Sequence, residues 1–589
     1  MTGANGTPPE IPRAVAEPSR LVGVYRRVLS PQTRRAIAKK VSPQTRHQLK
    51  QWVARASVEN QVAGRRGERL ARRQPELLAG GDRVVVTADR GPKVARVRPD
   101  VTPALARTGN VAAVTEALDE AGVPYFRVRG RSERSSVVAV DAADRDRVYA
   151  ALAAACARVP GYVLRGGEES SGRPAAPGFE AQVWRRLGDV PVLRLVWYWT
   201  DPRQRLVLGQ AYGCDVEFWT RQGDALVAPR PNPVAEQVVA TSPTVLASES
   251  VFTGLVPASA PATVRTRAEF AGRLPEDVTF PIDIVYTWVD GTDPDWLRRR
   301  AEVTGMPYHA EAASAARFLS RDELRYSLRS VHLFAPWVRH IYLVTDDQVP
   351  PWLDQSAPGL RVVSHREIFA DPSVLPTYNS HAIESQLHHI DGLSEHFLYF
   401  NDDVFLGTDV LPRDFFLGNG LSRFFPSPAL VPPGAPTAED IPSSAAGKNN
   451  RTLIGERFGS VLSRKMKHMP HALRRSVLWE IEREFPEEHR RTMASRFRNM
   501  TDISVASSLH HYYAFHTGRA VPGDLTYTIA ELSNPDTPAR LAHLLARRDR
   551  HVFCLNDAFS TEEDLERQLK ILTPFLDTYF PVPSPWERA

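Results

Sequence analysis

The chain has 589 residues, of which 42% are hydrophobic and 24% are charged. These proportions are typical of globular proteins, and they exclude collagen-like and wholly disordered chains. No stretch approaches the ~20 apolar residues that a membrane-spanning helix needs, and residues 1–13 lack the apolar core of a signal peptide. Three cysteines far apart, Cys156, Cys214 and Cys554, provide neither a disulfide framework nor a zinc ribbon. We therefore expect ordinary thiols in a reducing compartment and a cytoplasmic location.

Positive charge is concentrated near the N-terminus. The net charge of the chain is +6, yet residues 1–73 alone hold 16 Lys or Arg against four Glu. Within this segment a 12-residue unit occurs twice, at 30–41 and 42–53, and each copy begins with a Ser-Pro pair that favours a helix start. We interpret residues 1–78 as a basic helical arm. It either contacts the anionic inner face of a membrane or is a solvated regulatory or oligomerisation arm, and its few aromatic residues argue against nucleic-acid binding.

The next segment, residues 79–232, is predicted to be a small α/β domain. Apolar runs such as 83–88 and 192–199 are typical of strands, and 110–122 is typical of an amphipathic helix. No metal-binding or nucleophile pattern stands out, so we expect an accessory domain that supports or supplies acceptor specificity, with a purely structural role as the alternative. Residues 233–277 are rich in Ala, Pro, Ser and Thr, which predicts a linker.

The remaining segment, residues 278–580, has the most informative pattern. Strands of the buried type are predicted at 280–291, 340–347, 360–365 and 396–407. Helical patterns lie between them at 321–334 and 380–390. Strands that alternate with helices predict an α/β fold with a doubly wound, mostly parallel sheet. Because ligands of such sheets bind outside the carboxyl ends of the strands, we expect the site at that edge.

Acidic side chains follow two of these strands. Asn401, Asp402 and Asp403 come after the fourth strand, and Asp290 and Asp293 come after the first. Adjacent carboxylates suit a hard divalent cation, which usually takes one or two carboxylates together with substrate phosphates. Helix caps or solvated turns are the alternative, but the same edge is acidic at two places. The sequence therefore favours a site for a metal and a diphosphate.

A few further residues have the chemistry that such a site needs. Glu384 lies on the helix predicted at 380–390 and could act as a base or orient a neighbour. His468 could take up a proton, and Arg496 or Arg498 could clamp phosphate oxygens. The alternative for each is an ordinary surface or capping residue. A phosphate-binding P-loop and a nucleophile elbow are both missing from the sequence.

Four sequence blocks in order give a more specific indication: IDIVYTWVDGTDP, DELRYSLRSVHLFAPWVRHIYLVTDDQVPPWL, LPTYNSHAIESQLHHIDGLSEHFLYFNDDVFLG and CLND, with HMPH between the last two. At these residues the chain resembles the Stealth family of hexose-1-phosphate transferases. That family includes bacterial capsular and exopolysaccharide phosphotransferases and the lysosomal-enzyme GlcNAc-1-phosphotransferase. The blocks extend from Ile282 to Asp557, about half of the chain. The resemblance implies a nucleotide-sugar transferase-like sheet with helical insertions.

The resemblance also implies roles for individual residues. The implied catalytic positions are Glu384, Asp402, His468 and Arg498. The implied substrate-binding positions are Asp290, Gly291, Arg325, Asn401 and Asn556. A Mg²⁺ or Mn²⁺ ion is expected on Asp403 and Asp557. Whether Arg496 or Arg498 is the family's arginine, and whether His468 or Glu384 is the base, stays open.

The implied reaction is phosphoryl transfer between sugars. An acceptor hydroxyl attacks the sugar-linked phosphorus of a UDP-sugar, expels UMP and takes up sugar-1-phosphate, with a saccharide or polysaccharide as acceptor in capsular or exopolysaccharide synthesis. Two alternatives are a metal-dependent glycosyltransferase that releases UDP and a non-catalytic polysaccharide-binding protein. The transferred sugar, the acceptor and the oligomeric state stay open.

Overall fold

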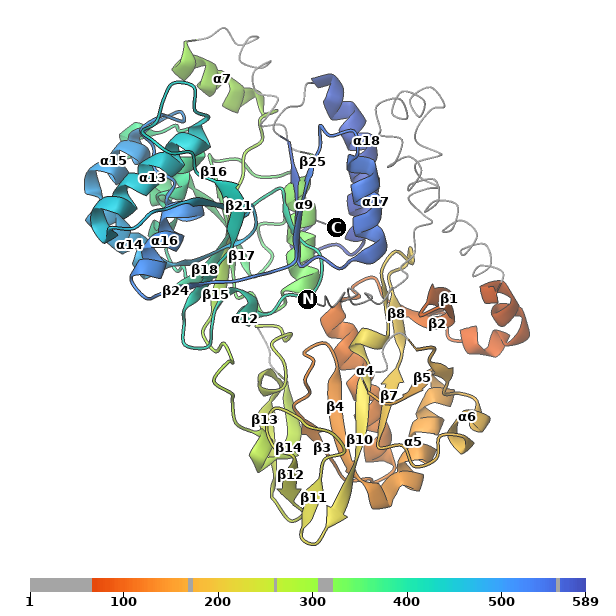
Figure 1. Cartoon of the computed structure of the whole chain (residues 1–589). Helices are drawn as coiled ribbons and strands as arrows, with labels where there is room; N and C mark the ends of the chain where they lie inside the picture. Colours follow the sequence, from red (N-terminus) through yellow and green to blue (C-terminus); the bar gives the residue numbers. More distant parts are fainter. Residues whose placement is uncertain (1–65, 168–172, 259–261, 306–320, 558–561, 589) are drawn as a thin grey trace, which may run out of the picture.

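The computed structural model describes residues 66–167, 173–258, 262–305, 321–557 and 562–588. Figure 1 shows an N-terminal domain in orange and yellow and a C-terminal domain in green and blue. The two helices expected at 30–41 and 42–53 lie outside the described residues. The arm is described from residue 66 on, where a helix at 66–73 precedes the short helix η1 (Pro75–Leu78). None of the described helices is both long and apolar enough to cross a membrane.

Two sheets form the N-terminal domain. The larger one has the strands β3 (Tyr125–Val128), β4 (Ser136–Asp141), β5 (Tyr162–Arg165), β6 (Ala176–Pro177), β7 (Val192–Val196), β10 (Cys214–Gln222), β11 (Ala225–Val227), β12 (Gln237–Val239), β13 (Thr244–Ser248) and β14 (Thr263–Arg267). Its main path runs β13-β14-β3-β4-β10-β7-β5-β6. The smaller one pairs β1 (Arg83–Ala88), β2 (Gly91–Val97), β8 (Tyr198–Thr200) and β9 (Val207–Leu208). The helices α4 (Pro103–Glu120) and α5 (Arg145–Arg158) pack on the larger sheet through Val114, Leu118 and Leu152.

The segment at 233–277 is not the linker that its composition predicts. It forms β12, β13 and β14, and β14 pairs with β3 to extend the N-terminal sheet. Phe252 and Phe270 of this segment are buried in a core cluster with Phe126 and Trp219. These two aromatic residues anchor the segment to the core of the sheet, although its composition is rich in Ala, Pro, Ser and Thr. We therefore assign it to the N-terminal domain.

A five-stranded sheet forms the centre of the C-terminal domain. Its strands are β15 (Ile282–Thr287), β16 (Ile341–Thr345), β17 (Leu360–Ser364), β18 (His396–Asn401) and β23 (His471–Arg474). The order is β17-β16-β15-β18-β23, and the first four strands are parallel whereas β23 is antiparallel to β18. The prediction of a doubly wound, mostly parallel sheet is confirmed. The chain moves outward from β15 to β17 and then returns to place β18 on the other side of β15.

Both faces of this sheet are buried, which explains the continuous apolar strands. Ile284 and Tyr286 belong to one core cluster, whereas Val285 between them belongs to the other. The helix α9 (Glu323–Phe334) packs on the first face, and α14 (Arg475–Glu484) and α16 (His510–His516) pack on the second. A strand covered on both faces needs no polar alternation, so its sequence is apolar throughout.

Further helices and two-stranded ribbons surround the central sheet. The helices are α7 (Pro294–Thr304), α10 (His365–Ile368), α11 (Ser380–Glu384), η9 (Leu387–His389), α12 (Pro412–Phe415), α13 (Pro442–Phe458), α15 (Pro486–Ala494), the π-helix η10 (Val505–Leu509), α17 (Thr537–Arg547) and α18 (Glu562–Tyr579). The ribbons pair β20 (Ser422–Phe424) with β24 (Ala520–Pro522) and β21 (Pro426–Leu430) with β22 (Arg464–Met466). A further sheet has the order β19 (Val404–Leu406), β26 (Val552–Asn556), β25 (Tyr527–Glu531). Because β19 follows β18 after two residues, this sheet begins at the acidic edge.

The two domains are joined by polar contacts from the loop at Glu133 and Arg134 and from Tyr212. Arg134 forms an ion pair with Asp409 at 2.9 Å, and the hydroxyl of Tyr212 donates to the same carboxylate over 2.8 Å. Arg413 pairs with Glu133 at 2.6 Å. Asp409 is buried, so these contacts satisfy a carboxylate that would otherwise be costly at the interface.

Candidate active site

The acidic edge predicted from the sequence lies where the strand order reverses. Thr287 at the end of β15 pairs with Asn401 at the end of β18, and these two strands are the neighbours from which the chain diverges. Asp402 and Asp403 follow Asn401 directly, and Asp290 follows Thr287 by three positions. Ligands of open α/β sheets bind in the crevice at this point. The fold thus brings both acidic segments to one edge.

Asp403 is the centre of a cluster of three side chains. His468 Nε2 lies 3.1 Å from Asp403 Oδ1, and the thiol of Cys554 donates to Asp403 Oδ2 over 3.3 Å. Cys554 is brought here because it pairs with Val404 across β19 and β26. Burial, and then the charge of Asp403, raises the pKa of Cys554 well above its ordinary value. The residue that we interpreted as an ordinary thiol therefore stays protonated and lies within the site.

The electrostatics of the edge are dominated by carboxylates. Burial, and then the negative charges of Glu323 and Asp403, raises the pKa of Asp402 well above its ordinary value. Burial also disfavours the charged form of Asp403, but the charge and hydrogen bond of His468 outweigh it and lower the pKa of Asp403. Burial likewise opposes the charge of His468, yet Asp403, Glu384 and Asp402 together raise its pKa. The edge holds more negative charge than its own residues neutralise.

A divalent cation fits this donor set. The carboxylates of Asp402 and Asp403 supply the oxygen ligands that Mg²⁺ and Mn²⁺ prefer. A cation bound between them would relieve the like-charge repulsion that raises the pKa of Asp402. The protonated thiol of Cys554 is a poor ligand for a hard cation, so the fit rests on the two carboxylates.

Glu384 is buried, so the surface alternative considered from the sequence does not apply to it. Its side chain is only 5% exposed. It is the last residue of α11, a helix whose start is capped by the side chain of Asn379. Ser507 donates to one carboxylate oxygen over 2.7 Å and the hydroxyl of Tyr399 donates to the other over 3.4 Å. The Tyr399 hydroxyl is also 3.0 Å from the Thr287 hydroxyl, so both central strands hold Glu384 in place.

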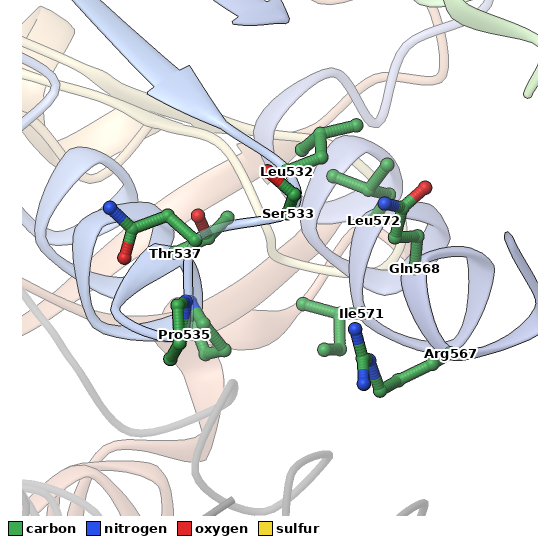
Figure 2. A pocket seen from close by; sticks show the side chains of 10 residues that line it. Leu532, Ser533, Pro535, Thr537, Arg567, Gln568, Ile571 and Leu572 are labelled. Carbon is green, nitrogen blue, oxygen red and sulfur yellow. The ribbon is translucent and has the colours of Figure 1, made fainter. Parts of the chain in front are cut away.

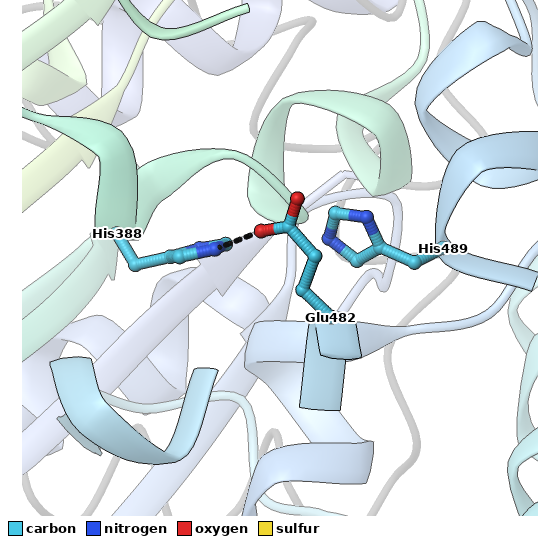
Figure 3. Close-up of side chains that lie close together, drawn as sticks. All are labelled: His388, Glu482 and His489. Carbon is cyan, nitrogen blue, oxygen red and sulfur yellow. Dashed lines mark hydrogen bonds and ion pairs between the residues drawn. The ribbon is translucent and has the colours of Figure 1, made fainter. Parts of the chain in front are cut away.

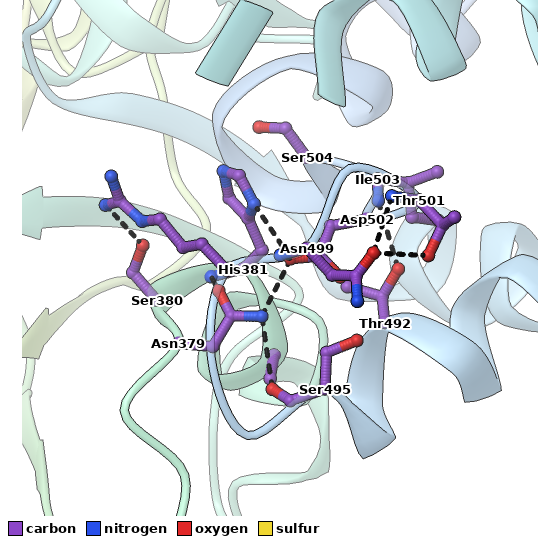
Figure 4. Close-up of polar contacts among 12 residues, drawn as sticks. Asn379, Ser380, His381, Thr492, Ser495, Asn499, Thr501, Asp502, Ile503 and Ser504 are labelled. Atoms are coloured by element: carbon purple, nitrogen blue, oxygen red, sulfur yellow. Dashed lines mark hydrogen bonds and ion pairs between the residues drawn. The ribbon is translucent and has the colours of Figure 1, made fainter. Parts of the chain in front are cut away.

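The loop that follows α15 lies against the start of α11, where Figure 4 shows Asp502 beside Asn379 and His381. Asp502 of this loop accepts a hydrogen bond from Asn379 over 2.8 Å, and its carboxylate lies 3.6 Å from His381 Nδ1. With the loop held at the start of α11, Arg498 donates to the hydroxyl of Ser380 over 3.0 Å. Arg498 therefore contacts the short helix that carries Glu384.

Two other arginines considered from the sequence are engaged elsewhere. Arg496 donates to the main-chain carbonyl of Val374 over 3.2 Å. Arg325, an expected substrate-binding residue, donates to Glu587 over 2.6 Å and lies over the ring of Trp352. Of the two candidate family arginines, Arg498 is the one that the structure places beside the Glu384 helix.

The remaining predicted residues lie around the edge without joining the cluster. Asp290 accepts hydrogen bonds from the main-chain N–H and the hydroxyl of Thr292 over 2.8 and 2.6 Å, which closes the turn after β15. Gly291 is buried within this turn. Asn556 donates to Glu531 of β25 over 2.5 Å. These contacts hold in place the segments that surround Asp402 and Asp403.

Sequence reasoning missed Arg321 and Glu323, which link the edge to Asp557. Asp557, an expected metal ligand, forms an ion pair with Arg321, and Arg321 also contacts Glu323. Arg321 donates to Gln568 over 3.0 Å, and Gln568 lines a small cavity between β25, α17 and α18 (Figure 2). The sequence signal that could have identified Arg321 and Glu323 was the Arg-Asp-Glu triplet at the start of the helix α9.

The comparisons agree with the sequence resemblance. Four family models match in order: Stealth protein CR1, conserved region 1, at 280–307, CR2 at 317–424, CR3 at 467–515 and CR4 at 542–589. The chain is 54% identical to an exopolysaccharide phosphotransferase of Streptomyces coelicolor over 97% of this chain and 99% of that protein. The chain belongs to the Stealth family. The predicted membership is confirmed.

Other relatives fit the same family. A second exopolysaccharide phosphotransferase of Streptomyces coelicolor is 52% identical over 97% of this chain and 98% of its own length. The exopolysaccharide phosphotransferase CpsY of Mycobacterium tuberculosis is 37% identical over 86% of this chain and 92% of its own. Among solved structures, a galactosyltransferase LgtC with donor and acceptor sugar analogues covers 52% of this chain and 98% of that chain, with a TM-score of 0.27 and 10% identity. A likeness of that degree supports no inference about the chemistry.

The Stealth regions meet at the candidate site. CR2 contributes Glu384, Asp402 and Asp403, CR3 contributes His468 and Arg498, and CR4 contributes Cys554. These regions are separated in the sequence by tens of residues, yet their side chains converge at one sheet edge. The parts of the chain that define the family are therefore the parts that build the site.

Proposed function

We propose that this Stealth-family chain transfers sugar-1-phosphate from a UDP-sugar to a hydroxyl of a saccharide or polysaccharide acceptor and releases UMP, in capsular or exopolysaccharide synthesis. The observation that carries the proposal is the convergence at one sheet edge of Glu384, Asp402, Asp403 and His468, with Arg498 in contact with the helix of Glu384. The relatives named exopolysaccharide phosphotransferases support the same class of reaction.

Neutralising the diphosphate is the first requirement of this reaction. Asp402 and Asp403 would hold Mg²⁺ or Mn²⁺, which when bound supplies positive charge over the diphosphate oxygens. Arg498 uses one N–H for Ser380, and the other donors of its guanidinium can face phosphate oxygens. Together they stabilise the charge that develops as UMP leaves.

Removing the proton of the acceptor hydroxyl is the second requirement. The side chain of His468 is 37% exposed, so it can reach a substrate. Both oxygens of Glu384 already accept hydrogen bonds from Ser507 and Tyr399. We therefore assign to His468 the removal of the proton from the acceptor hydroxyl. Glu384 and Asp403 stabilise the imidazolium ring of His468 that results.

The leaving group distinguishes this reaction from glycosyl transfer. Attack on phosphorus releases UMP and leaves a phosphodiester between two sugars, whereas attack on the anomeric carbon releases UDP and leaves a product without phosphorus. The full chain is incubated with Mg²⁺, a panel of UDP-hexoses and UDP-N-acetylhexosamines, and a short saccharide acceptor, and ³¹P NMR spectra are recorded. We expect a phosphodiester resonance that grows in step with UMP.

Each other outcome of this experiment has a clear meaning. Stoichiometric UDP with a phosphorus-free product would overturn the proposal in favour of a metal-dependent glycosyltransferase. Saccharide binding without release of any nucleotide from the whole panel would favour the polysaccharide-binding alternative. A variant with Asp403→Asn is the negative control, because it keeps the shape of the side chain and removes its charge.

We also propose that the basic arm, residues 1–78, attaches the protein to the anionic inner face of a membrane. The 16 Lys or Arg against four Glu in residues 1–73 support this role, since clustered basic residues attract anionic lipids. A variant that begins at Gly81 should keep turnover on soluble acceptors and lose salt-sensitive binding to liposomes that contain phosphatidylserine. Loss of turnover in a folded variant would contradict this division of roles.

A further inference from the structure

A second group of side chains with metal-binding chemistry lies where η9, α14 and α15 meet (Figure 3). His388 and His389 belong to η9, Glu482 to α14 and His489 to α15. His388 Nε2 lies 2.6 Å and His389 Nε2 lies 2.9 Å from the same oxygen of Glu482. Ligand atoms of His388, Glu482 and His489 all lie within 4.8 Å of one another. In Figure 3, the two rings approach the carboxylate from opposite sides.

The chemistry of the group suits a metal ion. Imidazole nitrogens and a carboxylate are donors that Zn²⁺ takes besides thiolates. His388 Nε2 and His389 Nε2 each direct an N–H at the Glu482 carboxylate, and a bound Zn²⁺ takes the place of such protons because metal binding releases protons from its ligands.

The spacing and exposure of the group also suit a metal ion. Ligands of tetrahedral Zn²⁺ at about 2.0–2.1 Å lie roughly 3.3 Å from one another. The Nε2 atoms of His388 and His389 lie 2.6 and 2.9 Å from Glu482, which is shorter than this value. The upper bound on the distances among the ligand atoms of His388, Glu482 and His489 is 4.8 Å, which is longer. Small side-chain rotations therefore suffice to bring the ligand atoms to the spacing that Zn²⁺ needs. The side chains of Glu482 and His389 are 29% and 16% exposed, which leaves a route from solvent.

We propose that His388, His489 and Glu482 bind one Zn²⁺ ion that joins η9, α14 and α15. No role in the transfer reaction is assigned to these residues. The ion replaces the hydrogen bonds among them with stronger bonds to one centre and links segments that are about 100 positions apart in the sequence.

The position of the ion has a consequence for the candidate site. His489 Nε2 lies 3.0 Å from the carbonyl of Ser385, the residue after Glu384. The helix α15, which carries His489, leads directly into the loop of Arg498. A metal at this place therefore holds the helix of Glu384 and the loop of Arg498 in a fixed position relative to each other. This consequence rests on the proposed function, whereas the binding of metal does not.

Metal binding can be measured on the full chain without any assay of turnover. The protein is stripped with EDTA, exposed to Co²⁺ as a coloured substitute for Zn²⁺, and freed of excess metal by gel filtration. Tetrahedral Co²⁺ absorbs visible light much more strongly than octahedral Co²⁺. We expect about one tetrahedral ion per chain, displaced by Zn²⁺, and metal analysis counts it.

Five variants locate the ion. His388→Gln, Glu482→Gln and His489→Gln should each lose the tetrahedral absorption and the corresponding equivalent of metal. Asp403→Asn, which alters the active-site cluster, and His543→Gln, which alters an exposed histidine of α17, should both retain the tetrahedral absorption. The proposal is overturned if the first three variants bind as much tetrahedral metal as the wild type, or if the wild type binds none.

A second measurement covers variants that fold poorly. Zn²⁺ bound to the folded state should raise the midpoint of thermal unfolding of the wild type and of Asp403→Asn. A wild-type midpoint that Zn²⁺ leaves unchanged would contradict the proposal without the use of any variant. Because the ³¹P experiment reports the leaving group and these measurements report the ion, a failure of one is distinguishable from a failure of the other.

Discussion

Two groups of carboxylates, one in the N-terminal domain and one at the acidic edge of the C-terminal domain, differ in how their charge is balanced. In the N-terminal domain, buried carboxylates are matched by guanidinium groups: Arg107 pairs with Glu249 at 2.7 Å, and Arg194 pairs with Asp215 at 2.6 Å. Arg230 adds a second ion pair to Asp215 at 2.7 Å. Each of these carboxylates accepts a hydrogen bond from at least one guanidinium group, so the protein itself balances its charge.

Among the described residues, Asp402 and Asp403 at the acidic edge of the C-terminal domain have no guanidinium partner of this kind. The two residues are adjacent, and Asp403 contacts the titratable ring of His468, on which the charge of Glu384 also acts. Uncompensated carboxylates cost folding free energy, and they persist where a bound cation or substrate supplies the opposite charge. The difference indicates that the first network serves stability and the second serves binding.

The largest effect should come from Asp403→Asn. The substitution keeps the size of the side chain and removes the charge that the metal and His468 need. We expect the rate of transfer to fall roughly 10³-fold, while the circular dichroism spectrum stays that of the wild type. Initial rates of UMP release measure this effect. Asp224→Asn, at an exposed turn of the N-terminal domain, is the matched control, and a rate near that of the wild type for Asp403→Asn would remove the basis of the comparison.

The corresponding change in the N-terminal domain should affect stability instead. Asp215→Asn leaves Arg194 and Arg230 without their shared carboxylate in a buried network. We expect the free energy of unfolding of this domain to fall by about 3–5 kcal/mol, while the rate at a permissive temperature stays near that of the wild type. Urea unfolding and initial rates test both parts. A loss of less than about 1 kcal/mol would show that this network is not what stabilises the domain.

A smaller effect should separate the two neighbouring arginines. Arg498→Lys keeps the charge beside the Glu384 helix but loses the planar fork that binds two phosphate oxygens. We expect a decrease of about 10–100-fold in the rate. Arg496→Lys is the matched control, because Arg496 donates to main-chain carbonyls and not to the cluster. Equal rates for the two variants would contradict the placement of the phosphate next to Arg498.

The smallest effect concerns the stability of the edge itself. Because the pKa of Asp402 is raised in the folded chain, ionisation of this group destabilises the fold as pH rises above its unfolded pKa of about 3.9. In EDTA at pH 7, Asp402→Asn should therefore unfold at a higher temperature than the wild type. We expect its free energy of unfolding to be about 1 kcal/mol larger. The difference should shrink as the pH falls below about 3.9, because Asp402 then becomes protonated in the unfolded state as well. A gain that does not depend on pH would exclude this cause.

The sequence by itself determined the α/β class and the acidic edge of the C-terminal domain. A parallel strand buried on both faces must be apolar throughout, so β15 and β18 were visible as continuous runs. The chain leaves such a strand at its carboxyl end, so the acids that follow it had to lie at the ligand-binding edge. Both inferences depend on local pattern and on a general rule of sheet topology.

The tertiary structure decided which residues meet. The segment at 233–277 became part of a sheet because Phe252 and Phe270 found a core to bury them, and composition does not report a distant core. Cys554 entered the site through the pairing of β26 with β19, and His388 gained Glu482 from 94 positions away. Such contacts depend on long-range packing, in which many side chains must fit at once, and a local pattern carries no record of its distant partners.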